Sequence, residues 1–165
     1  MNYYVLFTQT LKIEKVCQRM NKKQGIHAFI SRMETYIRTK DEVVLKMMFP
    51  GYLFIETTMN QEEFDILLNS LNEEKDGIIK ELKKNEVSAL TDDEVQLMYQ
   101  LLNKQGIFKM SEGYKENGKT IITKGPLLSF QENIIDTNKR DQIAILDIKF
   151  LNRNIKAGLK IKQNS

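Results

Sequence analysis

The sequence has little of what catalysis and metal binding need: one cysteine, one histidine and no tryptophan among 165 residues. One cysteine cannot form an internal disulfide, and one cysteine with one histidine cannot supply the ligands of a structural zinc site. A nucleophile pair would require Cys17 to meet His27, and no glycine-rich phosphate loop is present. The composition therefore opposes an enzyme, and neither a metal nor another cofactor is expected.

Long apolar runs are also missing. No segment approaches the roughly 18 consecutive apolar residues of a membrane helix, and the N-terminal apolar run has no basic stretch before it. The 41% of apolar residues is nevertheless enough for a folded core, and 165 residues suit one domain or two small ones. We therefore expect a cytoplasmic, soluble protein that makes no membrane contact and is a monomer.

The charged residues are distributed unevenly along the chain. Residues 1–107 carry 14 Lys and Arg against 16 Asp and Glu, whereas residues 108–165 carry 11 against 6, a net charge of +5. A basic C-terminal part suggests a polyanionic partner such as nucleic acid. Lysines that only keep the protein soluble would give the same count, so charge alone leaves both interpretations open.

The first ninety residues alternate between strand and helix patterns. Apolar positions at helical spacing predict a helix that starts at Ile13 and buries Cys17, and a second helix with Asn60 as its N-cap. β-Rich runs predict strands at residues 3–7, 26–30, 33–37, 43–48, 52–55 and 77–79. This order predicts an α+β domain, a mainly antiparallel sheet with helices packed on it.

The chain changes character after a third predicted helix, which opens with a capping box at residues 91–94. Beyond Gly106 the helical periodicity ends. Five short β-rich segments follow, at residues 107–110, 120–123, 130–136, 142–150 and 155–161. Closely spaced short strands favour a small closed β-barrel, which leaves no exposed edges. We expect domains at residues 1–104 and 114–165, joined by a linker at 105–113.

Both prolines of the chain lie in recognisable blocks. The first block is MFPGYLFIE at residues 48–56, and the second is KTIITKGPL at residues 119–127. Together they resemble the FPGY signature and the KOW motif of the NusG family of bacterial transcription elongation factors, in the same order. The opening residues 3–6 are similar to the aromatic first strand of that family. Residues 108–113 and 121–127 most resemble its LoaP branch.

The resemblance implies a NusG-type N-terminal domain followed by an SH3-like five-stranded KOW β-barrel. It implies docking on the clamp helices of the RNA polymerase largest subunit. The LoaP resemblance implies processive antitermination, with the KOW domain recruited through a nascent RNA hairpin. One alternative is a general NusG whose KOW domain contacts a ribosomal protein or a termination factor instead of RNA. Another is a ribosomal KOW protein, which the complete FPGY domain opposes.

Two sets of residues are candidates for these contacts. Large apolar side chains surround the first proline, and Tyr52 and Phe54 share one face of a strand. They suit either a docking patch or a core. The expected polymerase-docking residues are Phe7, Phe49, Pro50, Tyr52 and Phe54. Basic residues at predicted strand ends and turns can reach a phosphate backbone. The expected RNA-binding residues are Lys119, Lys124, Lys139, Arg140, Arg153 and Lys156.

Overall fold

The computed structural model describes residues 1–162, and the chain divides into two compact units. The first unit combines Met1–Ser31 with Phe49–Val95. The second combines Arg32–Met48 with the described chain from Gln96 onward. The division into domains at residues 1–104 and 114–165 with a linker at 105–113 stays a prediction. It does not foresee that Arg32–Met48, an internal segment of the predicted N-terminal domain, groups with the second unit.

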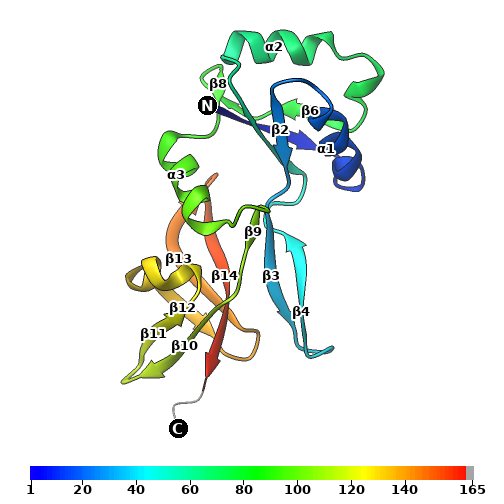
Figure 1. The fold of residues 1–165 in the computed structure, drawn as a ribbon. Coiled ribbons are helices and arrows are strands. Elements are labelled where there is room, and N and C mark those ends of the chain that lie inside the picture. Colours follow the sequence, from blue (N-terminus) through cyan, green and yellow to red (C-terminus); the bar gives the residue numbers. More distant parts are fainter. Residues whose placement is uncertain (163–165) are drawn as a thin grey trace. The chain divides into compact units, whose positions relative to one another are not determined.

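The first unit is built on a four-stranded antiparallel sheet (Figure 1). The strand order is β2-β5-β1-β6, so β5 and β1 are central. The strands are β1 (Asn2–Thr8), β2 (Ile26–Phe29), β5 (Tyr52–Thr57) and β6 (Ile78–Glu81). Its helices are α1 (Ile13–Asn21) and α2 (Gln61–Ser70), with 3-10 turns η1 (Thr10–Lys12) and η2 (Glu73–Lys75) and a small hairpin, β7 (Lys83–Lys84) and β8 (Val87–Ser88).

Helix α1 forms where the apolar spacing predicts it, with Ile13, Val16 and Met20 buried. The prediction that Cys17 lies in the core is wrong in degree, because this side chain is half-buried. Its thiol donates a hydrogen bond to the Ala28 carbonyl of β2 at 3.4 Å. Cys17 therefore lies at the edge of the helix–sheet contact, where a backbone acceptor is within reach.

Helix α2 begins at the predicted cap. The Asn60 side chain accepts a hydrogen bond from the Glu63 amide, and the Glu63 carboxylate accepts one from the Asn60 amide. The Phe64 ring of α2 stacks on Tyr4 of β1, with ring centroids 4.3 Å apart. This stack packs α2 against the face of the sheet that Tyr4 presents.

In the second unit, β3 (Arg32–Ile37) and β4 (Glu42–Met47) form the hairpin that the sequence predicts. They do not join the four-stranded sheet, so the prediction of one N-terminal sheet is wrong on this point. Instead β3 pairs in parallel with β9 (Ile107–Phe108). The Glu34 carboxylate also accepts hydrogen bonds from the Met110 amide at 2.8 Å and from Lys109 at 3.1 Å.

The remaining strands of the second unit form a curled sheet with the order β11-β10-β14-β13-β12. Strands β10 and β14 pair in parallel, and the other neighbours are antiparallel. The strands are β10 (Ser111–Glu116), β11 (Lys119–Lys124), β12 (Ile134–Asn138), β13 (Ile143–Phe150) and β14 (Arg153–Lys162). Their inward side chains, including Leu146, Ile155 and Leu159, form its core.

The curled sheet is open on one side, so the expectation of a closed barrel is wrong in this respect. Strands β11 and β12 do not pair, and the 3-10 segment η3 (Pro126–Asn133) connects them. Phe130 lies in η3 and not in the strand predicted for it. The Gly125-Pro126 pair explains the difference, because Gly125 has φ +104° and the proline then starts the 3-10 turn.

Helix α3 (Asp92–Leu101) opens with the predicted capping box. The Glu94 amide donates to the Thr91 hydroxyl at 3.2 Å, and the Glu94 carboxylate accepts from the Thr91 amide at 3.1 Å. Acidic residues fill the first helical turn, where the helix dipole favours negative charge. The acidic run at residues 92–94 is therefore explained by helix initiation.

Candidate functional site

Strands β2, β5 and β1 present aromatic side chains on one face of the first sheet. The register places Phe29 opposite Phe54 and Phe7 opposite Tyr52. Ring centroids are 5.6 Å apart in the first pair and 5.8 Å apart in the second. We refer to these four residues together with Phe49 as the aromatic face. It lies opposite the face that Tyr4 and α2 occupy, because successive residues of a strand point to opposite sides.

The turn before β5 folds Phe49 onto this face. Its backbone carbonyl accepts a hydrogen bond from the Tyr52 amide at 3.0 Å, and Gly51 provides φ +86°. A Cβ at Gly51 would lie 3.0 Å from the Thr8 carbonyl oxygen, so the turn requires glycine. The Phe49 ring centroid is 6.1 Å from that of Tyr52 and 6.4 Å from that of Phe54. The proline–glycine pair thus brings the ring of Phe49 back onto the strand that follows it.

The five residues predicted to bind polymerase differ in how much they expose. Phe54 is only 1% exposed and Phe49 8%, so both belong to the core of the protein. Phe7 and Tyr52 are half-buried, and Pro50 is exposed. The side chains that a partner can reach are therefore Phe7, Tyr52 and Pro50. The buried ring of Phe54 packs against Phe29 and Phe49 of this face. Polymerase docking by these residues stays a prediction.

The residues predicted from the sequence do not include two aromatic side chains on the same side of the sheet, His27 and Phe29. His27 of β2 is exposed, and its ring centroid is 5.6 Å from that of Phe29, which is half-buried. Phe29 in turn contacts Phe54. The alternation within residues 26–30 is the signal for them, because Ile26, Ala28 and Ile30 are buried while the two aromatic rings point the other way.

The six predicted RNA-binding residues are all exposed, but they do not lie together. Lys119 and Lys124 begin and end β11, and Lys139 and Arg140 form the turn between β12 and β13. Arg153 begins β14, and Lys156 lies three residues further along it. The end of β14 is Lys162, about 30 Å along the strand from Arg153. RNA binding by any of the six stays a prediction.

An acidic pair in the first unit is held by internal contacts. The Gln61 amide donates to Asp65 at 3.0 Å and to both oxygens of Glu81 at 3.1 Å. Lys83 forms an ion pair with Asp65 at 2.9 Å and lowers the pKa of that carboxyl. Burial raises the pKa of Glu81. These contacts tie α2 to β6 and β7, and we assign them a structural role.

A polar pocket of about 480 Å³ lies at the open side of the curled sheet, between β11 and β12. Both signs of charge line it, and Lys119 pairs with Glu132 there at 3.2 Å. Within the described part of the chain, no group of His, Cys, Asp and Glu side chains is arranged to hold a metal ion. Across residues 1–162, each helix is too short or too polar to serve as a membrane span.

Comparison with protein families bears directly on the aromatic face. The family model described as NusG, transcription termination factor nusG, matches residues 1–99, which include the strands and the turn that build this face. The chain belongs to the NusG family. Membership implies a transcription elongation or termination factor that binds RNA polymerase, and factors of this family are generally non-enzymatic. A search of curated proteins finds no match to the chain.

The NusG match covers the part of the chain that carries the FPGY block and ends before the curled sheet. The general prediction of an α+β fold in this NusG-family protein is confirmed. The KOW identity of the C-terminal sheet and the LoaP assignment stay predictions.

Proposed function

We propose that this NusG-family protein docks on RNA polymerase through its aromatic face and promotes processive antitermination. In this proposal it is recruited to particular transcripts by a nascent RNA hairpin, which its C-terminal sheet binds. The observation that carries the docking half is the aromatic face itself. Paired rings on neighbouring strands and a turn that depends on glycine set its shape within the part of the chain that matches the family.

The proposed partner of the aromatic face is the clamp-helix pair of the polymerase largest subunit. Helices bury apolar side chains in shallow hydrophobic surfaces, and aromatic anchors contribute most to such interfaces. Phe7 and Tyr52 lie opposite each other on neighbouring strands, with Pro50 at the adjacent turn. A helix pair seated here would contact all three side chains.

The RNA half of the proposal is supported by the charge of the C-terminal part, with 11 basic against 6 acidic residues after residue 107. A curled sheet of five strands also fits the proposed KOW domain of the SH3-like type. Basic side chains at strand ends and turns suit double-helical RNA, which proteins recognise mainly through its shape and phosphates. The LoaP branch is the proposed placement within the family.

The proposed mechanism requires no catalysis. A factor that binds the elongating conformation of polymerase more tightly than the paused conformation shifts the equilibrium toward elongation. RNA bound by the second unit would raise the local concentration of the docking unit at one transcript, because both belong to one chain. This linkage accounts for action on particular operons.

Transcription through a terminator tests the function as a whole. We expect the purified protein to increase readthrough on templates that carry structured leader RNA from long operons of the source organism. We expect no increase on matched templates from which the leader is deleted. Equal readthrough on both templates would contradict recruitment by RNA and favour a general NusG. Lack of any effect on either template would contradict antitermination.

The salt dependence of RNA binding tests the predicted turn residues. Replacing Lys139 and Arg140 with Ala should remove two phosphate contacts and lower the slope of log K against log salt by about 1.4 to 1.8. The control is Lys104→Ala with Lys149→Ala, two exposed lysines of the same unit outside the predicted set. A slope equal to that of the control would place the RNA contact elsewhere. Absence of RNA binding by the native chain would instead favour a protein partner for this sheet.

A further inference from the structure

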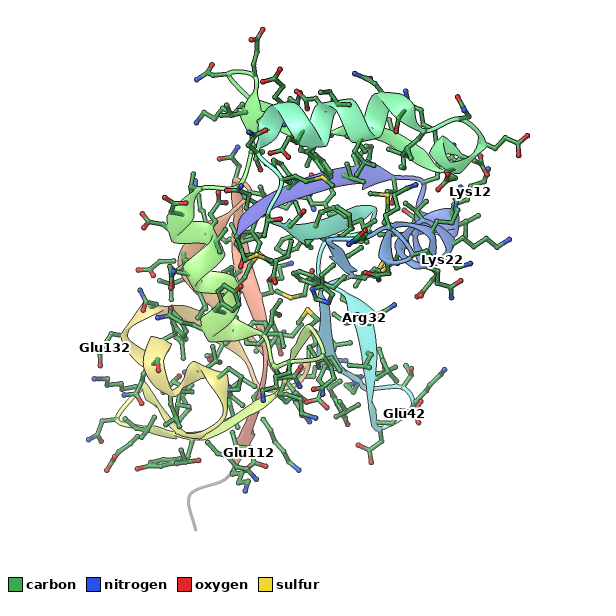
Figure 2. All side chains as sticks on the ribbon, turned by 45° about the horizontal axis from the view of Figure 1, so that its top comes forward. Lys12, Lys22, Arg32, Glu42, Glu112 and Glu132 are labelled. Carbon is green, nitrogen blue, oxygen red and sulfur yellow. The ribbon has the colours of Figure 1, made fainter. Side chains whose placement is uncertain are left out.

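The end of the curled sheet where β14 finishes gathers lysines from two strands around one carboxylate. The register pairs Glu112 of β10 with Lys124 of β11 on one side and with Lys160 of β14 on the other. The Lys162 amine lies 3.2 Å from the Glu112 carboxylate. Figure 2 labels Glu112 beside the end of β14. We call Lys124, Lys160 and Lys162 the basic end.

Lys160 and Lys162 point to the same side of the sheet as Glu112, and an irregularity in the pairing of β10 with β11 places Lys124 opposite Glu112. Residues that pair across neighbouring strands share a face, and so do residues two positions apart in one strand. Lys160 and Lys162 therefore project beside Glu112, on the face opposite the buried Leu159 and Ile161. All three lysines are exposed, whereas Glu112 is half-buried between them.

The turn between β12 and β13 lies at the same end of β14. Strand β13 begins with Ile143 opposite Gly158, and the Leu159 amide donates to the Gln142 carbonyl at 2.9 Å. The turn that precedes Gln142 carries Lys139 and Arg140. Besides Lys124, two more of the residues predicted from the sequence thus belong to the neighbourhood of the basic end, whereas Arg153 lies at the opposite end of β14.

The basic end already stabilises one anion. The hydrogen bond from Lys162 holds the pKa of the Glu112 carboxyl below its ordinary value, and the charges of Lys124 and Lys160 act in the same direction. One carboxylate cannot neutralise three ammonium groups. The excess positive charge is compact, exposed and carried on flexible stems, a form that suits phosphate groups.

We propose that the basic end is the site where RNA phosphates bind, and that Glu112 is an internal competitor that a phosphate displaces from Lys162. The inference rests on the proposed function, since it assigns the surface on which the RNA lies. It adds two lysines that the sequence reasoning did not select, Lys160 and Lys162. It also assigns to Glu112 a role that weakens RNA binding.

Binding of the full chain to a labelled RNA hairpin tests the lysines. A hairpin of about 16 base pairs presents two successive minor grooves and is followed by fluorescence anisotropy over a salt series. Lys160→Ala with Lys162→Ala should weaken binding at least roughly tenfold and lower the salt slope by about 1.4 to 1.8. The control Lys104→Ala with Lys149→Ala should change the affinity less than about twofold.

Replacement of the competitor gives the sharper test, because a gain of affinity cannot come from misfolding. Glu112→Gln should tighten RNA binding about threefold by leaving Lys162 available, and should raise the salt slope by up to about 0.9. The net-charge control is Asp147→Asn, which replaces an exposed carboxylate of β13, a strand that carries none of the three lysines of the basic end. Both variants change the net charge equally.

The outcomes separate this inference from the proposed function. If the native chain binds RNA but Lys160→Ala with Lys162→Ala behaves like its lysine control, the basic end is not the site while RNA binding stands. If Asp147→Asn tightens binding as much as Glu112→Gln, the gain reflects net charge alone and the competitor role is wrong. If the native chain binds an acidic peptide and not the hairpin, both the inference and the RNA half of the proposed function fail.

Discussion

Replacing Phe7 and Tyr52 with Thr should abolish measurable binding to RNA polymerase while the first unit stays folded. Both rings are half-buried and lie opposite each other on β1 and β5, so their outer surface is available to a partner. Aromatic anchors at an interface contribute about 2 kcal/mol or more each. The loss of two would weaken binding roughly a thousandfold. Threonine keeps the strands intact because β-branched residues favour them.

Pull-down and fluorescence titration with core RNA polymerase measure this loss, and far-UV circular dichroism checks the fold. The matched control is Ile79→Thr with Val87→Thr, which replaces two exposed apolar residues in other strands of the same unit. It should bind polymerase like the native chain. Unchanged affinity of the folded Phe7→Thr, Tyr52→Thr variant would contradict docking through the aromatic face.

The local part of the fold follows closely from the sequence. Helix α2 begins at the predicted Asn60 cap, and α3 begins at the predicted Thr91 box, because capping depends on residues three positions apart. The FPGY block has the same local character, since Gly51 supplies the left-handed turn that places Phe49 on β5. Sequence patterns that lie within about ten consecutive residues therefore predict the local structure of those residues.

Pairing between distant segments was not predictable in the same way. Arg32 pairs with Ile107, which lies 75 positions further along the chain, and a two-residue strand such as β9 has too few positions to show an alternation. Strand β10 was missed because its inward residues are Ser111 and Gly113, which give no apolar pattern. The basic end is likewise not predictable from the sequence, because only the register of β10 with its neighbours shows that lysines surround Glu112.

Phe54 gives the largest expected effect on stability, and it separates support from contact within the aromatic face. Its ring is 1% exposed and contacts the rings of Phe29 and Phe49. Phe54→Ala removes most of a buried side chain and should destabilise the first unit by about 3 to 5 kcal/mol. That is a large share of the roughly 5 to 15 kcal/mol that holds a domain folded. Urea unfolding followed by circular dichroism measures the loss.

Loss of polymerase binding by Phe54→Ala would not by itself show contact, because the docking surface would unfold with the core. Phe54→Leu distinguishes the two roles. Leucine fills much of the same volume in a buried site and costs less stability than alanine. If Phe54 only supports its neighbours, the folded Phe54→Leu variant should bind polymerase within about threefold of the native chain, well short of the loss expected for an interface anchor. A folded Phe54→Leu variant that binds as weakly as Phe7→Thr with Tyr52→Thr would instead make Phe54 a contact residue. The burial of its ring argues for support, with Phe7 and Tyr52 as the anchors.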